Sequence, residues 1–513
     1  MLSSIKELFV VSALAALVFY FAKPIALQFM RAEDFSRRRL TWFLLTGASF
    51  ISPNFWLYTL VAVPMLVWAY RRDANPIALY AFMLHVIPPV PVIIPILGVN
   101  GLFPLDNFRL LAFCVLLPGS LRYRRDLNGK RVVAFGPMDA LLLAFGALQI
   151  ALYTCPDLPH HSYIPDSATN ALRRALLFLL DAYLLYYSVS RICRSRAMLI
   201  EIAASFCLAS GVMAAIAMFE HTRGWLLYVD IASRWGTDRN AAFYLMRGGA
   251  VRAQVSAGHS IALGHVLAVA FGFWLYLKSH VGDQKRRIGG IVLYWGGLIA
   301  AFSRGGWLGA AVIYFTFNAV GPRAVSRLAK GAAIAAAMGC LVLASPMGDT
   351  VLQMLPQPGH TADLYRHRLA ERGWELVFAH PLFGDQFPWP AMEDLRQGEG
   401  IIDLVDTYLG VALNYGLVGL FCFLGFILIG MTKVYVRSRA LVRSDPDLAM
   451  IGASLVACIV GTLVMIDSNS FNMGPERILY MLAGLAAAYS RIAKSPQEAT
   501  AAASDNNVPQ ERR

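Results

Sequence analysis

The chain has 513 residues, of which 57% are hydrophobic and only 15% are charged. An ordinary soluble domain is about 25% charged, so this composition excludes an ordinary water-soluble globular protein. The net charge of +13 does not indicate nucleic-acid binding, because the basic residues are confined to short segments between long apolar runs. Runs long enough to cross a bilayer recur from end to end. The sequence therefore predicts an all-α, polytopic integral membrane protein.

The first apolar run extends from Leu8 to Ala22 and follows a single lysine. It has no clear small-residue cleavage site, which favours a membrane anchor over a removed signal peptide. The seven cysteines are scattered, mostly in predicted spans, with no CxxC pair and no metal-ligand spacing. We therefore expect neither a structural disulfide nor a metal site.

The basic clusters orient the chain, since short loops rich in Lys and Arg remain in the cytoplasm. They lie at 31–39, 71–72, 122–131, 191–196, 278–287, 323–330 and 433–443. Between two such clusters the chain must cross the membrane an even number of times. The polar tail at 493–513 is expected to be disordered and cytoplasmic.

Predicted spans follow one another in chain order, and several are short or broken by proline, so we expect about 12 to 15 transmembrane helices. They lie near 7–29, 40–52, 53–70, 76–98, 107–120, 137–154, 171–190, 197–219, 258–278, 288–320 (a hairpin), 331–345, 406–431, 448–466 and 475–492. Two long segments remain outside, 220–257 and 346–405, and long loops often carry function.

The apolar segment 288–320 lies between two basic clusters, so it must form a hairpin of two short helices. Each arm of about 15 residues is about 23 Å long, which is shorter than the hydrocarbon core of about 30 Å. Its tip, Ser303-Arg304-Gly305-Gly306, is therefore expected just below the outer surface. An arginine in hydrocarbon costs from about 2.5 to over 10 kcal/mol. Arg304 either faces a cavity that opens outward or snorkels to fix the topology.

Small residues in the same hairpin favour a close helix contact. Gly305 and Gly309 are four residues apart, and this GxxxG spacing lets two helix backbones approach each other. The spacing is more often a packing feature than part of a binding site.

Four segments in order resemble the O-antigen ligase and polymerase superfamily of bacterial membrane glycosyltransferases. They are RAQVSAGHSIALGH from Arg252, FSRGGWLG from Phe302, YRHRLAERGWELVFAHPLFG from Tyr365 and VDTYLGVALNYGLVGL from Val405. The similarity covers roughly residues 200 to 430, and each segment alone is a weak pattern. The resemblance implies N-terminal transmembrane helices at 1–195, a catalytic core at 196–431 that includes the outer loop 346–405, and C-terminal transmembrane helices at 432–492.

The resemblance implies transfer of a glycan from undecaprenyl diphosphate on the periplasmic face of the bacterial inner membrane. The acceptor is another lipid-linked repeat unit in polymerases, or lipid A–core in ligases. No metal, cofactor or nucleotide sugar is implied. The expected partners are the undecaprenyl diphosphate-linked glycan, membrane lipid, a chain-length regulator and a repeat-unit flippase, with no nucleic acid.

One departure separates the two activities. Ligases of the family typically carry a His-Asn pair where this chain has Val405-Asp406. This favours a polymerase of O-antigen, capsule or exopolysaccharide repeats over a ligase that joins glycan to lipid A–core or protein. A transporter of a lipid-linked or anionic substrate is the alternative from another class, since proline-broken spans and intramembrane arginines also suit one.

The leaving group of such a transfer is a diphosphate, which planar and permanently charged arginines bind well. Arg252, Arg304 and Arg366 come from three outward-facing segments and could converge on one diphosphate. Arg368 and Arg372, four apart on the same expected helix, are further candidates.

The acceptor hydroxyl needs a proton acceptor or an orienting partner. The candidates are Asp403, Asp406, Glu371 and His380. Asp403 and Asp406 could instead begin the next helix, where acidic residues suit the dipole. His380 could simply end a helix, because the residue before a proline disfavours its continuation.

Four further residues are candidates for substrate contact, namely His259, Ser303, Trp374 and Tyr408. His259, at the entrance of a span, could equally serve interfacial packing. Trp374 could stack on a sugar face or bury the outer loop on the membrane surface.

Overall fold

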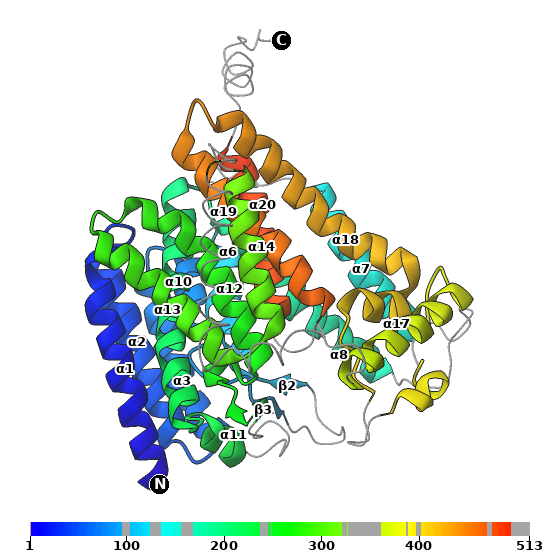
Figure 1. Cartoon of the computed structure of the whole chain (residues 1–513), viewed down its shortest axis with the longest axis horizontal. Helices are drawn as coiled ribbons and strands as arrows, with labels where there is room; N and C mark the ends of the chain where they lie inside the picture. The colour runs from blue at the N-terminus through cyan, green and yellow to red at the C-terminus, as the bar shows by residue number, and fades with distance from the viewer. Residues whose placement is uncertain are drawn as a thin grey trace, which may run out of the picture.

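A computed structural model describes residues 2–94, 103–123, 135–154, 168–235, 245–247, 249–320, 326, 361–385, 388–396, 402–468 and 475–493. The described chain is helical apart from loops and two antiparallel ribbons of two strands each. One ribbon pairs β1 (Val92–Ile93) with β2 (Pro104–Leu105), and the other pairs β3 (Met246–Arg247) with β4 (Ala250–Val251). The prediction of an all-α polytopic membrane protein is confirmed (Figure 1).

The helices follow most of the predicted spans, but the span predicted near 76–98 is wrong in its second half. There the helix ends at Met83, and turns and loop lead to β1. The helices are α1 (Leu2–Ala26), α2 (Ala32–Ile51), α3 (Phe55–Arg72), α4 (Pro76–Met83), α5 (Asn107–Leu111), α6 (Leu117–Arg122), α7 (Pro137–Thr154), α8 (Ala168–Phe178), α9 (Leu184–Ile192), α10 (Arg196–Arg223), α11 (Val229–Trp235), α12 (Ser260–Leu277), α13 (Gln284–Ala301), α14 (Arg304–Val320), α17 (Thr361–Ala379), α18 (Thr407–Leu441), α19 (Pro446–Asp467) and α20 (Pro475–Ile492). A π-helical turn joins α5 to α6 and another joins α8 to α9.

Seven helical segments in the described ranges are long and apolar enough to cross a membrane. They are Ser3–Ala26, Pro137–Thr154, Leu172–Ile192, Arg196–Arg223, Ser260–His280, Thr407–Leu441 and Pro446–Asp467. Shorter or more charged helices such as α2, α3, α13 and α14 occupy the other predicted crossings, so the total of about 12 to 15 stays a prediction. The predicted span 331–345, residues 346–360 and the tail after 493 lie outside the described residues.

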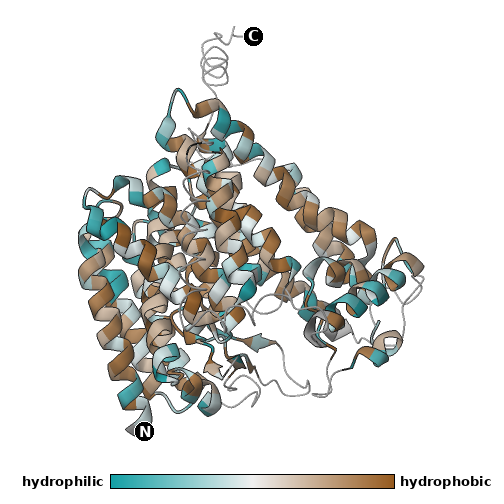
Figure 2. Ribbon diagram, in the orientation of Figure 1, coloured by the Kyte–Doolittle hydropathy of each residue, from teal (hydrophilic) through white to brown (hydrophobic). Residues whose placement is uncertain are grey.

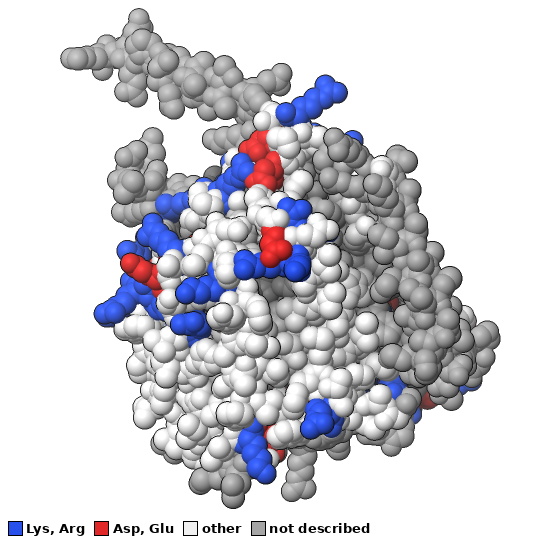
Figure 3. All heavy atoms as spheres, turned by 60° about the vertical axis from the view of Figure 1, so that its left-hand side comes forward, with Lys and Arg blue, Asp and Glu red and all other residues white. Residues whose placement is uncertain are grey.

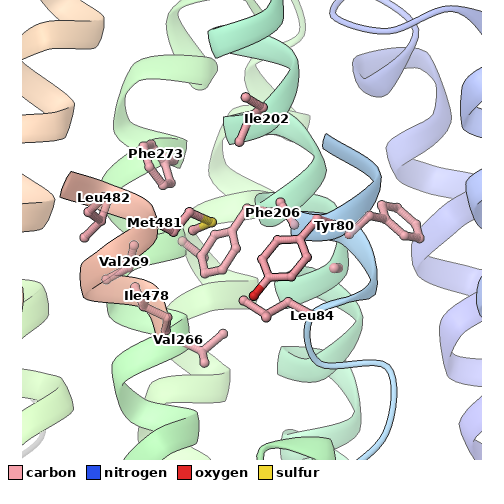
Figure 4. Packing of buried hydrophobic residues seen from close by; sticks show 14 of the residues in the cluster. Tyr80, Leu84, Ile202, Phe206, Val266, Val269, Phe273, Ile478, Met481 and Leu482 are labelled. Carbon is pink, nitrogen blue, oxygen red and sulfur yellow. The ribbon is translucent and has the colours of Figure 1, made fainter. Parts of the chain in front are cut away.

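The core lies where α10 and α12 meet α4 and α20. In the spanning windows of α12 and α10, 94% and 83% of the residues are buried. Figure 4 shows Tyr80 of α4, Phe206 of α10, Phe273 of α12 and Met481 of α20 packed against one another. Hydrophobic residues run along the length of the helices, and hydrophilic ones gather toward their ends and on α17 (Figure 2).

The predicted cytoplasmic loops meet at one end of the bundle. Arg37 Nη1 donates to the carbonyl of Arg72 at 2.7 Å, and Arg194 Nη2 donates to the carbonyl of Tyr123 at 2.6 Å. Arg196 pairs with Asp445 at 3.0 Å. Loops that lie far apart in the sequence therefore share one end, as the basic clusters predict. The end formed by β3, β4 and the α13–α14 turn is called the outer end below.

A buried ionic cluster ties α2, α3 and α10 together near the basic end. The Arg38 side chain is fully buried, and its Nη2 lies 2.6 Å from Asp73 Oδ1 and 2.7 Å from Glu201 Oε1. Asp34, Asp73 and Glu201 lie close enough together to hold a metal ion. Because the Arg38 guanidinium already bridges two of these carboxylates, an arginine supplies the compensating charge that a cation would otherwise bring.

Replacing Arg38 with leucine should lower the free energy of unfolding by about 3–5 kcal/mol, because two buried carboxylates lose their counter-charge. Thermal unfolding of the purified protein in detergent measures the effect. Arg71, exposed at the end of α3, provides the matched control, since Arg71→Leu removes the same charge without breaking a buried pair. Equal losses in both variants would contradict a stabilising role for the cluster.

Candidate functional site

The tip of the hairpin is a two-residue turn between α13 and α14. Phe302 has left-handed backbone angles of φ 48° and ψ 41°, and α14 begins at Arg304. Trp307 Nε1 donates to the carbonyl of Leu298 at 2.7 Å and so ties the two helices together. The predicted hairpin with its tip at Ser303 and Arg304 is confirmed. Arg304 thus stands at the first turn of a helix, where the dipole favours an anion nearby.

Small residues allow α14 to contact its neighbours closely. A Cβ atom on Gly306 would lie 2.9 Å from the Gly264 Cα of α12, and one on Gly309 would lie 2.3 Å from the Met465 sulfur of α19. A Cβ on Gly305 would lie 3.2 Å from Ser468 Oγ. Gly305 and Gly309 therefore both face α19, and the GxxxG spacing serves helix packing. Ser303 is also buried, with its side chain against Gly264.

Four arginines gather at the outer end. Arg247 Nη1 donates to the carbonyl of Phe302 at 3.0 Å. Burial lowers the pKa of Arg247, and the charges of Arg304 and Arg366 lower it further. Arg252 is 8% exposed, and burial followed by the charge of Arg247 lowers its pKa to about 10. We call these residues the outer arginine cluster, namely Arg247, Arg252, Arg304 and Arg366.

Each member of the cluster comes from a different segment. Arg247 lies on β3, Arg252 follows β4, Arg304 begins α14 and Arg366 lies on α17. Arg247 interacts electrostatically with Arg252, Arg304 and Arg366, the three arginines that the sequence suggested for one diphosphate. Arg247 was not predicted from the sequence. The feature that could have indicated it is its position in the same outer segment as Arg252.

Three members of the cluster have no carboxylate partner within the described part of the chain. No acidic group there lies within ion-pair distance of Arg247, Arg252 or Arg366. The Arg252 Nε atom is buried and has no hydrogen-bond partner among the described residues. Arg252 is buried, Arg247 and Arg304 are half-buried, and Arg366 is exposed. A buried charge is costly unless it is paired, so the surroundings of Arg252 are suited to an anion with several oxygens.

Glu220, which sequence reasoning also missed, shapes the loop that carries Arg252. Its buried carboxylate accepts backbone hydrogen bonds from Leu227 at 2.9 Å and from Gln254 and Val255 at 3.0 Å. The neighbouring His221 Nδ1 lies 2.7 Å from the carbonyl of Val251. The carboxylate is therefore occupied by backbone donors and holds the loop rather than neutralising an arginine.

His259 stands beside the cluster as the N-cap of α12. Its Nδ1 accepts a hydrogen bond from the Ile261 backbone at 3.2 Å. Burial, followed by the charge of Arg252, lowers the pKa of His259 to about 4. The imidazole is therefore neutral at neutral pH and does not add to the positive charge.

Two carboxylates lie at the outer ends of α18 and α19. Asp406 caps α18, and its Oδ1 accepts from the backbone of Tyr408 at 2.8 Å and of Leu409 at 3.2 Å. Burial raises the pKa of the Asp406 carboxyl, and the charge of Asp467 raises it further. The Tyr408 hydroxyl donates to the carbonyl of Leu463 at 2.7 Å and so fixes α18 against α19.

This carboxylate pair lies next to the hairpin tip. Asp467 directly precedes Ser468, whose hydroxyl lies against Gly305, and Gly305 follows Arg304. The sequence alone left Asp406 either as a helix start or as a base. The structure shows the helix start, and it adds Asp467, which sequence reasoning missed.

The outer loop is fixed to the N-terminal part of α18. The Asp403 N–H donates to the Tyr365 hydroxyl at 2.9 Å, which places the start of α17 beside the start of α18. Trp374 is partly buried in a small apolar cluster, the loop core, which joins α17 to Leu409 and Leu413. Trp374 thus packs the outer loop against α18. Its two predicted roles, burial of the loop on the membrane surface and sugar stacking, stay predictions.

The remaining candidates of α17 face solvent. Glu371 Oε1 lies 3.3 Å from His367 Nδ1, and Arg372 Nη1 lies 3.0 Å from Glu375 Oε2, all on exposed side chains. Arg368 is exposed as well. Among the described residues no contact joins Glu371, Arg368 or Arg372 to the outer arginine cluster, so their roles stay predictions.

The segment 380–385, which we call the loop plug, inserts into a break in α18. The Leu417 N–H donates to the carbonyl of Pro381 at 2.8 Å, and the Asp385 N–H donates to the carbonyl of Leu413 at 2.7 Å. Gly416, with φ 66° and ψ −172°, makes the break. The helix α17 ends just before His380 and Pro381, as the X-Pro rule suggested. The structure therefore shows a direct contact between two of the segments that carry the family resemblance.

Comparisons with models of known protein families and with curated proteins find no match to this chain. The resemblance thus rests on its four segments. Three of them supply Arg252, Arg304 and Arg366 to the outer arginine cluster, and the fourth supplies Asp406.

Proposed function

We propose that the protein is a membrane glycosyltransferase of the bacterial inner membrane. It polymerises undecaprenyl diphosphate-linked repeat units of O-antigen, capsule or exopolysaccharide on the periplasmic face. The observation that carries this proposal is the outer arginine cluster, which gathers four positive charges at one end of a membrane bundle.

The chemistry is a displacement at an anomeric carbon. The bond between that carbon and the diphosphate oxygen breaks, and a bond to the acceptor hydroxyl oxygen forms. The diphosphate leaves with the bonding electron pair, so negative charge develops on it. Fixed guanidinium groups stabilise this charge without reorganisation in the transition state, and their planar donors match phosphate oxygens.

The acceptor hydroxyl must lose a proton, and Asp406 is suited to take it. Its Oδ1 is engaged by two backbone N–H groups, which fixes the carboxylate and leaves Oδ2 for a substrate hydroxyl. The raised pKa of Asp406 makes it a stronger base than an ordinary aspartate. Ligases of the family that the chain resembles carry a His-Asn pair at the position of Val405 and Asp406. This difference favours a polymerase over a ligase.

The decisive experiment supplies the purified protein with a synthetic undecaprenyl diphosphate-linked repeat unit and resolves the products by gel. A ladder that persists with EDTA supports a metal-independent polymerase. Product that forms only after lipid A–core is added would instead indicate a ligase. Absence of transfer with either acceptor, together with passage of the lipid-linked unit across vesicles, would indicate a transporter.

The pH dependence of transfer tests the role of Asp406. A base is active only when ionised, so the rate should rise with pH through the pKa of Asp406, with a midpoint above the ordinary value of 3.8. Asp467→Asn removes the neighbouring charge that raises this pKa. The midpoint should therefore move to lower pH in this variant.

Two further variants complete this test. Asp406→Asn should reduce the rate about a hundredfold at unchanged stability, because asparagine caps a helix as well as aspartate does. Asp394→Asn removes an exposed outer-loop charge and should leave the midpoint in place. A wild-type rate in Asp406→Asn would limit Asp406 to helix capping.

A further inference from the structure

A second notable site lies at the end of the bundle opposite the outer arginine cluster. A cavity of about 590 Å³ opens between α1, α10 and α13, and its walls are mainly apolar residues such as Val18, Ala22 and Leu208. Lys285 and Arg286, in the first turn of α13, stand at its mouth. The basic clusters of the chain share this end of the molecule.

The same face carries further positive charge. A neighbouring hollow of about 570 Å³ between α1 and α2 shares Phe21 and Arg286 with the cavity and adds Lys23 and Arg39. Among the described residues, neither hollow has an acidic residue in its lining, although Arg286 Nε lies 3.5 Å from the exposed Asp283. Figure 3 shows Lys and Arg gathered toward one end of this face above a broad uncharged surface.

A tryptophan in the cavity wall has a polar atom without a partner. Trp274 is 6% exposed, and its Nε1 has no hydrogen-bond partner among the described residues. The indole lies against Gly290, where a Cβ atom would be 2.2 Å from the ring. Both residues line the cavity. A buried N–H group normally finds an acceptor, so an oxygen-bearing ligand would satisfy this donor.

We infer that this cavity binds an anionic phospholipid from the leaflet at the basic end. An acyl chain occupies the apolar space between α1, α10 and α13, and the phosphate lies near Lys285 and Arg286. A headgroup or ester oxygen accepts a hydrogen bond from Trp274 Nε1. Basic pockets between transmembrane helices are suited to anionic headgroups, and tryptophan favours this depth of the membrane.

The test measures which lipid the purified protein retains. The full chain is reconstituted in equal amounts of phosphatidylglycerol and phosphatidylcholine, extracted in mild detergent and examined by native mass spectrometry. The wild type should retain phosphatidylglycerol preferentially. Lys285→Gln/Arg286→Gln should reduce this preference at least about tenfold, since each basic residue near the surface contributes about a factor of five.

Three comparisons make the test specific. Lys433→Gln/Arg443→Gln removes two exposed charges at the same end and should retain the lipid as the wild type does. Trp274→Phe keeps the ring but removes the N–H donor, and it should weaken retention about fivefold. Gly289→Leu, at a cavity position with open space around it, should fill the acyl site and exclude the lipid.

Equal retention of the two lipids by the wild type would overturn the inference. So would equal retention by the Lys285/Arg286 variant and the Lys433/Arg443 variant. The inference does not depend on glycan transfer, because the cavity and the outer arginine cluster lie at opposite ends and the readout is lipid retention alone.

Discussion

Arg247→Gln should reduce glycan transfer by about 10²- to 10³-fold, the usual loss when one preorganised donor to a developing anion is removed. Arg247 connects the cluster, because its charge acts on Arg252 and it lies near Arg304 and Arg366. It also holds the hairpin tip through the Phe302 carbonyl. Arg304→Ala should have a loss at least as large.

The stability of Arg247→Gln should change much less than its activity. Removing one of several like charges relieves repulsion, which offsets the loss of the hydrogen bond to the Phe302 carbonyl, so the free energy of unfolding in the absence of substrate should stay close to that of the wild type. A residue that only supports the fold gives a different pattern, with stability and activity lost together. Initial rates of repeat-unit incorporation and thermal unfolding of the same samples separate the two cases.

Arg372→Gln is the matched control. Arg372 belongs to the same outer loop and the same resembling segment, but it is exposed and paired with Glu375 at 3.0 Å. It should keep a transfer rate within about twofold of the wild type, as expected for an exposed pair of small energy. If Arg372→Gln and Arg247→Gln lose activity equally, the outer arginine cluster is not the diphosphate site. The transfer rate of Arg247→Lys should lie between those of the wild type and Arg247→Gln, since lysine keeps the charge but not the planar guanidinium group.

The hairpin could be predicted from the sequence because two simple constraints determine it. Basic clusters on both sides of 288–320 require an even number of crossings, and the segment is too short for anything but two short helices. Its tip therefore had to lie near Arg304. The spans around α2, α3, α10 and α19 followed in the same way from charge and apolar length.

The cluster itself could not be derived in full, because tertiary packing creates it. Arg247 reaches the hairpin tip only since β3 pairs with β4 and the Ala253 N–H donates to the carbonyl of Ala300 at 3.0 Å. No local pattern in the sequence encodes that contact. The role of Asp406 could not be predicted from the sequence either, because an aspartate just before a helix can be a helix cap or a catalytic base, and the local sequence is the same in both cases. The environment of Asp406 differs from that of an ordinary capping aspartate because Asp467, at the end of α19, lies near it.

Gly416→Ala should destabilise the outer half of the protein strongly. The backbone angles of Gly416 lie in a region that only glycine adopts readily, and a Cβ atom there would be 2.1 Å from the Leu382 carbonyl oxygen. That neighbour is backbone and cannot move away alone. The strain of about 1–3 kcal/mol adds to the loss of the plug's hydrogen bonds, so we expect a loss of about 3 kcal/mol or more.

Gly410 provides a control on the same helix. A Cβ atom added to Gly410 would meet no neighbouring atom within 4 Å. Alanine is favoured over glycine in a helix by up to about 1 kcal/mol. Gly410→Ala should thus retain or raise stability. Hydrogen exchange distinguishes the two variants directly, since the amides of Leu417 and Val418 donate to the loop plug and should lose protection only in Gly416→Ala. Unchanged protection there would show that the plug tolerates a side chain at the break.

The plug also connects this stability to the proposed activity. The loop plug follows α17 directly, and α17 carries Arg366 toward Arg247. When the plug is released, Arg366 loses its fixed position while Arg252 and Arg304, on other elements, keep theirs. Gly416→Ala should therefore reduce transfer as Arg366→Gln does, and combining the two changes should add little further loss. An additive loss in the double variant would mean that the plug supports the reaction through some other part of the outer loop.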